Sequence, residues 1–335
     1  MTIADRRPDT SLGGDPALRR YEDVTELLPS VRQPTPLVRV RRTLPEGGAE
    51  VWLKLEWLNP FGSVKDRAAA AMLEGLERRV GLGGRRIVEA SSGNTAIALA
   101  ALAAVRGVPV TIAIPDGVPE EKQTLLRMLG AEVWPTPDDL CPIDHPKDGA
   151  IALARSILAS DPAFVTTDQY ANLDNVRAHY ETTGPEIWRQ TEGRIRVFLA
   201  GFGTCGTITG VGRYLKERDP TIRVVGVEPE PGHRLPGLKS FAEAKEPEIL
   251  DRSVVDDVVV VSDEDAYRRT LELHRREGLL VGPSTGAVVH AASVLDAPGA
   301  LAVAISPDSS MKYLSWFGEL VADDGNPSVF DEEER

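Results

Sequence analysis

A glycine-rich loop carries the sharpest chemical signal in the sequence. An apolar run over residues 195–200 leads into the loop, and a helix is expected from its end to about Arg218. The loop combines glycines with hydroxyl side chains: Gly201, Gly203, Thr204, Gly206, Thr207 and Thr209. Glycines let backbone amides approach an anion closely, and the N-terminus of a helix adds positive charge. The hydroxyls favour a compact phosphate monoester over a pyrophosphate, so we predict a terminal phosphate here; a plain strand-to-helix turn is the alternative.

The same glycines keep a second cofactor class open. Glu228 ends the next predicted strand, close to where a Rossmann-type enzyme places the acid that binds the adenosine ribose. An NAD-dependent oxidoreductase that uses Gly201 to Gly206 together with Glu228 therefore stays an alternative on these residues alone.

One lysine stands at the start of an alanine-rich helix. The turn 59–64 leads into Lys65, which is followed by Asp66 and Arg67. A helix dipole disfavours a cation at the helix N-terminus, which lowers the pKa of an amine there and favours the neutral form needed for a Schiff base. A solvent-facing lysine paired with Asp66 is the simpler alternative.

Two further polar segments follow predicted strands. Residues 91–95, Ser-Ser-Gly-Asn-Thr, offer hydroxyl, amide and backbone N–H donors at the start of a helix, which suits a carboxylate. Ser284 follows a short predicted strand and the pair Gly282 and Pro283, and its hydroxyl either caps the next helix or binds a ligand. Each segment taken alone is also explained as an ordinary helix N-cap.

The elements that must position these residues alternate between strand and helix from about residue 85 onward. Strands are predicted at 86–90, 109–114, 131–134, 163–166, 196–200, 223–227, 258–261 and 300–305, and helices at 94–106 and 120–129. This order is typical of parallel βαβ units, and the continuous apolar character of the strands predicts burial on both faces. The fold class is therefore α/β. We expect a surface loop at 135–146, near a domain boundary, and a frayed acidic tail from residue 322.

The composition excludes several function classes. The 335 residues carry 38 Lys and Arg against 51 Asp and Glu, a net charge of −13, which argues against nucleic-acid binding. Cys141 and Cys205 allow neither a disulfide framework nor a zinc site, and we expect no metal. The pair Arg6 and Arg7 lacks the apolar segment of an export signal, and no apolar run approaches the ~20 residues of a bilayer span. We expect a soluble, cytoplasmic protein with no membrane partner.

The polar motifs, taken together and in this order, resemble one enzyme family. The motifs lie at 59–67, 91–95, 203–207 and 282–286, with further matches at 34–37 and 182–188. They resemble the cysteine synthase and cystathionine β-synthase family, the pyridoxal 5′-phosphate (PLP) enzymes of fold type II, over about residues 30–318. The resemblance implies two domains, each a mostly parallel twisted sheet covered by helices, and PLP as the cofactor.

The resemblance also implies roles for individual residues. Lys65 is the Schiff-base lysine and general base, Asn94 binds the 3′-oxygen of PLP, and Ser284 faces the pyridine nitrogen. The phosphate cup is Gly203, Thr204, Cys205, Gly206 and Thr207, and the substrate carboxylate is bound by Ser91, Ser92, Gly93, Thr95 and Gln169. Three positions depart from the family pattern: Cys205 and Ala96 replace usual glycines, and Leu173 stands where a proline is common.

The implied domains are a large PLP-binding domain of residues 1–57 and 160–320, a smaller mobile domain of residues 58–159 that carries the asparagine loop, and an acidic tail of residues 321–335. The implied reaction is β-replacement. An activated serine, O-acetylserine or O-phosphoserine, loses its β-substituent to give an aminoacrylate, and sulfide or another thiol donor adds to make cysteine. Cystathionine β-synthase or diaminopropionate chemistry, and a catalytically inactive relative, are the alternatives. Members are usually homodimers.

Two cations are candidates for binding the leaving group. Arg234 and Lys239 lie after the strand that ends with Glu228, at the side of the sheet where ligands collect. A cation there favours O-phosphoserine over O-acetylserine, whereas two solvated side chains on a loop are the alternative.

Overall fold

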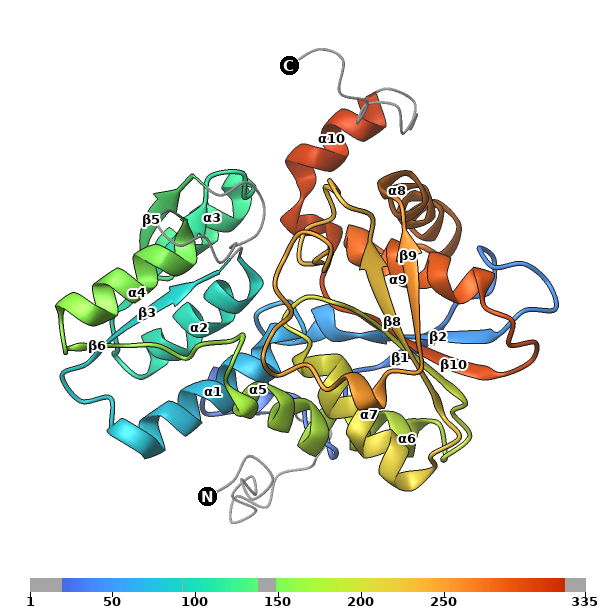
Figure 1. Ribbon diagram of the computed structural model, residues 1–335, viewed down its shortest axis with the longest axis horizontal. Helices are drawn as coiled ribbons and strands as arrows, with labels where there is room; N and C mark the ends of the chain where they lie inside the picture. The colour runs from blue at the N-terminus through green and yellow to red at the C-terminus, as the bar shows by residue number, and fades with distance from the viewer. Residues whose placement is uncertain (1–19, 92, 138–148, 323–335) are drawn as a thin grey trace.

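Two β-sheets organise the computed structural model, which describes residues 20–91, 93–137 and 149–322 (Figure 1). The six-stranded sheet consists, in order across the sheet, of β1 Leu37–Arg39, β2 Glu50–Leu55, β10 Leu301–Ser306, β7 Val197–Gly201, β8 Arg223–Pro229 and β9 Asp257–Val261. The four-stranded sheet consists of β5 Glu132–Thr136, β4 Val110–Pro115, β3 Arg86–Ala90 and β6 Phe164–Val165. All strand pairs are parallel except β1 with β2. The predicted α/β class with two mostly parallel sheets is confirmed.

Helices cover both sheets. They are α1 Lys65–Val80, α2 Asn94–Val105, α3 Glu120–Met128, α4 Ala150–Ser160, α5 Leu173–Ala178, α6 Gly184–Gln190, α7 Gly206–Arg218, α8 Asp263–Glu272, α9 Pro283–Val294 and α10 Leu314–Ala322. In Figure 1, α6 and α7 lie below the six-stranded sheet, and α8 and α9 lie above it. Helix α1 packs against α2 and α5, and α5 packs against α7, so these helices join the two halves of the molecule.

The strands of the six-stranded sheet are buried on both faces, as their apolar runs predict. In β7, Val197 and Leu199 belong to one apolar cluster, while Phe198 and Ala200 belong to another on the opposite face. A separate cluster fills the space between α1, α2 and the four-stranded sheet. Each sheet therefore has its own apolar core, and the residues that lie between the two sheets are available to form a binding site.

The structure differs from the predicted secondary structure at two places, and a third prediction lies partly outside the described residues. The short strand predicted before Gly282 does not form, because the chain leaves a π-helical turn, Leu273–Glu277, through the left-handed Gly278, and only Val281 makes an isolated bridge, with Ser309. The strands β1 and β2 were not predicted. The predicted loop 135–146 begins inside β5, and its residues from 138, like the tail beyond 322, lie outside the described residues.

The proposed division of the chain at residues 57 and 160 stays a prediction. Strand β6, beyond residue 160, pairs with β3 in the four-stranded sheet. Within the described ranges, none of the helices has both the length and the apolar character needed to cross a membrane.

Candidate active site

Two adjoining pockets bring most of the predicted residues together. The first, which we call the cup pocket, is lined by side chains and backbone that include Lys65, Asn94, Gly203, Thr204, Cys205, Thr207, Ser284 and Asp308. The second, the loop pocket, is lined by residues that include Lys65, Ser91, Asn94, Thr95, Lys122, Gln169, Tyr170, Lys239 and Tyr313. Five residues line both pockets and stand where they meet: Lys65, Asn94, Gly203, Thr204 and Gly237.

The glycine-rich loop forms a cup at the N-terminus of α7, as predicted. Two of its glycines are required by close packing: a Cβ on Gly203 would lie 2.5 Å from the carbonyl oxygen of Gly237, and one on Gly206 would lie 2.0 Å from Oδ1 of Asn175. Cys205 is the N-cap residue of α7 and adopts a left-handed backbone with φ of 65°. Left-handed backbone is strained for residues other than glycine, which gives a physical reason for the glycine that the family resemblance leads us to expect here.

A buried histidine orients a hydroxyl of the cup. Nε2 of His179 lies 3.2 Å from Oγ1 of Thr207, and its Nδ1 lies 2.9 Å from Oγ1 of Thr183. Burial lowers the pKa of His179 to about 3, so the ring is neutral at physiological pH. The cup therefore combines backbone amides, the helix N-terminus and hydroxyls, a donor set that suits a phosphate.

Lys65 is the first residue of α1 and lines both pockets. Burial lowers the pKa of its amine, and the nearby Asp308 carboxylate partly opposes this effect. The surface pairing with Asp66 does not occur. The buried Asp66 carboxylate instead accepts hydrogen bonds from the Phe61 amide (2.6 Å) and the Ser63 hydroxyl (3.3 Å), and burial raises its pKa to about 7. A lowered pKa favours the nucleophilic neutral amine, with burial rather than the helix dipole as its largest cause.

A buried ion cluster fixes the start of α1. Arg67, two residues after Lys65, donates to Glu56 (2.7 Å) and to Glu186 (2.6 Å), and Lys54 also donates to Glu186 (2.6 Å). Burial alone would raise the pKa of Glu56, but the adjacent Arg67 lowers it to about 2. The cluster ties the start of α1 to β2 and α6, and removing one partner would leave an uncompensated buried charge.

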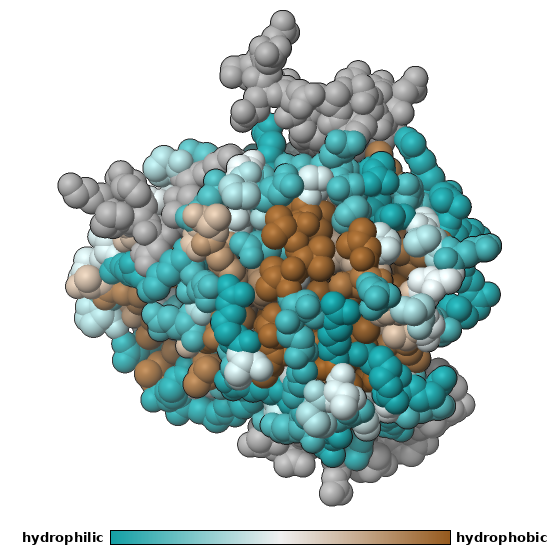
Figure 2. Space-filling model, turned by 45° about the vertical axis from the view of Figure 1, so that its right-hand side comes forward, coloured by the Kyte–Doolittle hydropathy of each residue, from teal (hydrophilic) through white to brown (hydrophobic). Residues whose placement is uncertain are grey.

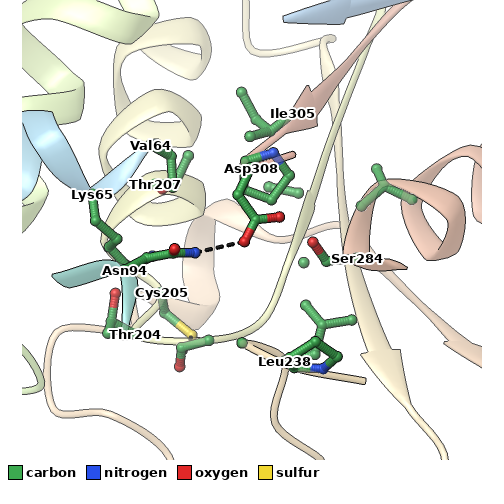
Figure 3. Close-up of a pocket in the computed structure, with 17 residues that line it drawn as sticks. Val64, Lys65, Asn94, Thr204, Cys205, Thr207, Leu238, Ser284, Ile305 and Asp308 are labelled. Atoms are coloured by element: carbon green, nitrogen blue, oxygen red, sulfur yellow. Dashed lines mark hydrogen bonds between the residues drawn. The ribbon is translucent and has the colours of Figure 1, made fainter. Parts of the chain in front are cut away.

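Asn94 begins α2 and is held by residues from the segment after β10. Its Nδ2 donates to Oδ2 of Asp308 (2.6 Å), and its Oδ1 accepts from Nζ of Lys312 (3.2 Å). Figure 3 shows Asp308 between Asn94 and Ser284 in the cup pocket. Oδ2 of Asp308 also accepts from the hydroxyl of Tyr313, while its buried Oδ1 has no hydrogen-bond partner among the residues that the structure describes.

The segment after β10 was missed by sequence reasoning. Lys122 on α3 donates to the Tyr313 hydroxyl (3.0 Å), so residues more than 180 positions apart meet beside the loop pocket. The available signal was the position of Asp308, just beyond the carboxyl end of a predicted buried strand, where ligands collect in parallel sheets.

Ser284 is not a helix cap. The N-cap of α9 is Gly282 with Pro283 at the first helical position, and no side chain caps the helix. The Ser284 hydroxyl belongs to the second helical residue and lines the cup pocket. Of the two explanations offered by the sequence, capping is wrong, and the assignment to a ligand nitrogen stays a prediction.

The Ser91–Thr95 loop and Gln169 meet in the loop pocket. Oγ1 of Thr95 donates to Oε1 of Gln169 (2.6 Å), and Nε2 of Gln169 donates to the carbonyl of Ala90 (2.9 Å). Gly93 has φ of 132° and packs against the stem of Lys122. Oγ of Ser91 accepts from the amides of Gly93 and Ala96, both at 3.2 Å. Ser92 lies outside the described residues.

The acid that an oxidoreductase needs is engaged elsewhere. Oε1 of Glu228 accepts from the backbone amide of Phe241 (2.6 Å), so its carboxylate holds a loop of the protein. The glycine cup therefore lacks the free acidic side chain that would bind the ribose of a dinucleotide cofactor.

The described part of the chain contains no cluster of three or more His, Cys, Asp or Glu side chains placed to bind a metal ion.

This combination of a phosphate cup, a buried lysine and two mostly parallel sheets defines the class of PLP enzymes of fold type II. The family model described as pyridoxal-phosphate dependent enzyme matches residues 29–304, and the chain belongs to this family. The family's cofactor is PLP, which leaves the nicotinamide alternative without support.

Relatives span almost the same length as this chain. Cysteine synthase B of Salmonella typhimurium is 43% identical over 290 residues, which cover 85% of this chain and 94% of the relative. Cysteine synthase of Aquifex aeolicus is 41% identical over 307 residues, 88% of this chain and 92% of the relative. The crystal structure of a hydrogen sulfide-producing enzyme from Fusobacterium nucleatum superimposes with a TM-score of 0.78 at 33% identity, covering 88% of this chain and all of that one.

The residues present fit PLP. The glycine cup has no room for added side chains, its donors match a phosphate, and the one lysine shared by both pockets has a lowered pKa. Lys65 would hold the cofactor covalently, Gly203, Thr204, Cys205, Gly206 and Thr207 would surround its phosphate, and Asn94 and Ser284 would flank its ring.

Proposed function

We propose that the protein makes cysteine by β-replacement on an activated serine, O-acetylserine or O-phosphoserine, with sulfide or a thiol donor as the nucleophile. The observation that carries the proposal is the loop pocket, in which hydroxyl and amide side chains of a kind that suits a carboxylate line the same cavity as Lys65. The names of the relatives, cysteine synthases and a hydrogen sulfide-producing enzyme, point to the same sulfur chemistry at Cβ of an amino acid.

The residues divide the work between binding and proton transfer. Bound PLP supplies the electron sink for the reaction. Ser91, Thr95 and Gln169 bind the substrate carboxylate, which orients the amino acid with Cα near Lys65. Burial lowers the pKa of the Lys65 amine, which favours the neutral form that accepts the Cα proton as general base. Ser284 offers a neutral hydroxyl, which does not hold a proton on the pyridine nitrogen, and this favours loss of the β-substituent over other fates.

The leaving group would face a cationic side of the loop pocket. Lys239 lines this pocket, is 7% exposed, and lies 5.1 Å from the ring centre of Tyr170. Arg234 does not line either pocket. Of the two cations singled out in the sequence, Lys239 is therefore the one that we assign to the β-substituent.

The test is direct. The purified protein with PLP, given O-acetylserine or O-phosphoserine and sodium sulfide, is expected to form cysteine, followed by proton NMR. Lys65→Ala should lower turnover by about a thousandfold or more, because general base and covalent attachment are lost together. Arg78→Ala, at the solvent-exposed end of the same helix, is the matched control and should turn over normally. Absence of cysteine from both activated serines in a PLP-loaded wild type would overturn the proposal.

We also propose that the protein is a cytoplasmic homodimer. The edge strand β9 exposes Val258 (41%) and Val260 (56%), and Leu280 is 50% exposed. Figure 2 shows apolar side chains gathered on the middle of the face it presents. An apolar edge strand needs a cover, and a second copy of the chain fits the family resemblance. Light scattering of wild type and of Val260→Lys is the test: a dimer that the variant weakens is expected, and a wild-type monomer would contradict the proposal.

A further inference from the structure

Glu89, near the end of β3, is a buried carboxylate whose hydrogen bonds all go to one loop. Its side chain is 2% exposed, and no ion pair with it occurs in the described ranges. Oε2 accepts from the Thr167 hydroxyl (2.5 Å), the Thr166 hydroxyl (3.1 Å) and the Asp168 amide (3.1 Å). Oε1 accepts from the Gln169 amide (3.3 Å). A buried carboxylate is costly, so such a set of donors indicates a specific purpose.

The loop that Glu89 holds has an unusual backbone. Asp168 adopts φ of 50°, a left-handed conformation that is uncommon and somewhat strained for residues other than glycine, although aspartate tolerates it better than most. The two amides bonded to Glu89 belong to Asp168 and its neighbour Gln169, so the carboxylate stabilises the strained turn directly. Strain of this kind persists only where the surrounding structure enforces it.

The turn delivers Gln169 to the loop pocket. Gln169 is 3% exposed, and its amide group bridges the Thr95 hydroxyl and the carbonyl of Ala90, the residue after Glu89. The backbone carbonyl oxygen of Gln169 accepts a hydrogen bond from Nδ2 of Asn175. The same Nδ2 also donates to the hydroxyl of Thr204 in the cup (3.2 Å). Glu89 thus acts through Gln169, whose contacts extend to Thr95 in the loop pocket and, by way of Asn175, to Thr204 in the cup.

We propose that Glu89 is a positioning residue for the substrate carboxylate, which it serves by holding the 166–169 loop so that Gln169 stays against Thr95. This inference rests on the proposed function, in which Gln169 and Thr95 bind that carboxylate. Substitution by glutamine keeps the size of the side chain but places N–H donors against hydroxyl and amide donors. Because glutamine keeps one acceptor oxygen and replaces the other with an NH2 group, part of the loop loses its acceptor, whereas the cup and Lys65 keep their contacts.

The first measurement needs no turnover. Hydrogen exchange of the PLP-loaded protein without substrate is compared for wild type, Glu89→Gln and the control Glu132→Gln, an exposed carboxylate in the same sheet. Glu89→Gln should speed exchange of the amides of Asp168 and Gln169 about tenfold or more, since one decade corresponds to 1.4 kcal/mol. The control should leave both amides unchanged. Thr167→Val, which removes one hydroxyl and keeps the carboxylate, should act in the same direction more weakly and covers the case in which Glu89→Gln does not fold.

The second measurement separates positioning from general support. For cysteine formation from O-acetylserine, Glu89→Gln should raise KM about tenfold or more with a smaller change in kcat and an unchanged affinity for PLP. The double variant Glu89→Gln with Gln169→Ala should be no worse in KM than Gln169→Ala alone, because the carboxylate acts through that side chain. Unchanged exchange at Asp168 and Gln169, additive KM effects, or parallel loss of PLP affinity would each overturn the inference. If wild type makes no cysteine, the proposed function fails, and the exchange measurement alone decides whether Glu89 positions the loop.

Discussion

The two pockets are built in different ways for the anions that we propose they bind. The cup pocket, on the six-stranded sheet, uses a backbone loop, and its glycines are fixed by contacts such as that of Gly203 with Gly237. The loop pocket, beside the four-stranded sheet, uses side chains that hold one another, as in the bond from Thr95 to Gln169. Backbone recognition tolerates few substitutions and provides a fixed anchor, whereas side-chain recognition can be tuned for a substrate. We therefore expect changes at the cup to affect the cofactor and changes at the loop to affect the substrate.

Among the changes that compare the two pockets, the largest effect is expected at Ser284 in the cup pocket. If Ser284 faces the pyridine nitrogen, as we predict, Ser284→Asp places a carboxylate there and favours the protonated ring through a charge-assisted hydrogen bond. Cysteine formation should fall by about a hundredfold or more, at 1.36 kcal/mol per decade. PLP should still bind because Lys65 and the cup are unchanged. Stopped-flow absorbance with O-acetylserine, with turnover measured in parallel, is the check, and near-normal turnover would remove Ser284 from the mechanism.

The second prediction tests the backbone anchor. A Cβ at position 203 would lie 2.5 Å from the carbonyl oxygen of Gly237, and neither group is a flexible side chain. Gly203→Ala should therefore weaken PLP binding at least about tenfold by displacing the cup. Gly83→Ala, where an added Cβ meets no atom within 4 Å, is the matched control. Equilibrium titration with PLP compares the two, and equal affinities would show that the cup tolerates a side chain.

The third prediction concerns the loop pocket, which is built from side chains. If Lys239 binds the β-substituent, Lys239→Ala should lower kcat/KM for O-phosphoserine about tenfold more than for O-acetylserine, because only the first is a dianion. The ratio of the two specificity constants is the measurement. Arg234→Ala is the control, since Arg234 lines neither pocket. Equal losses for both substrates would exclude Lys239 as a selector of the leaving group.

The smallest effect is a pH dependence of stability that originates beside the cup. Burial lowers the pKa of His179 to about 3, against about 6.5 in the unfolded chain. The unfolded state binds the extra proton between these values, so the free energy of unfolding should decrease as the pH falls below 6.5, by about 2 kcal/mol at pH 5. His179→Gln should remove this part of the slope. The test is the free energy of unfolding in urea, measured at pH 5 and pH 7 for wild type and His179→Gln. The same change with pH in both proteins would mean that His179 is charged when folded.

The sequence predicted the cup better than the surroundings of the loop pocket. The cup lies within one strand, one turn and one helix, so its glycines and threonines are visible in a single segment. The contacts of Asn94 with Asp308 and of Lys122 with Tyr313 join residues about 200 positions apart, and no local pattern reveals them. The role of Glu89 was hidden for the same reason, because its partners lie in the 166–169 loop.

Lys65 is the lysine that we propose binds PLP, and the proposed function requires it. Three other lysines, Lys122, Lys239 and Lys312, lie in or beside the two pockets, which makes the assignment a real choice. Borohydride reduction of the PLP-loaded protein, followed by peptide mass spectrometry, should place a single pyridoxyl group on Lys65, and the yellow colour should disappear on reduction. A label on Lys122, Lys239 or Lys312, or no label in a protein that binds PLP and makes cysteine, would contradict the account.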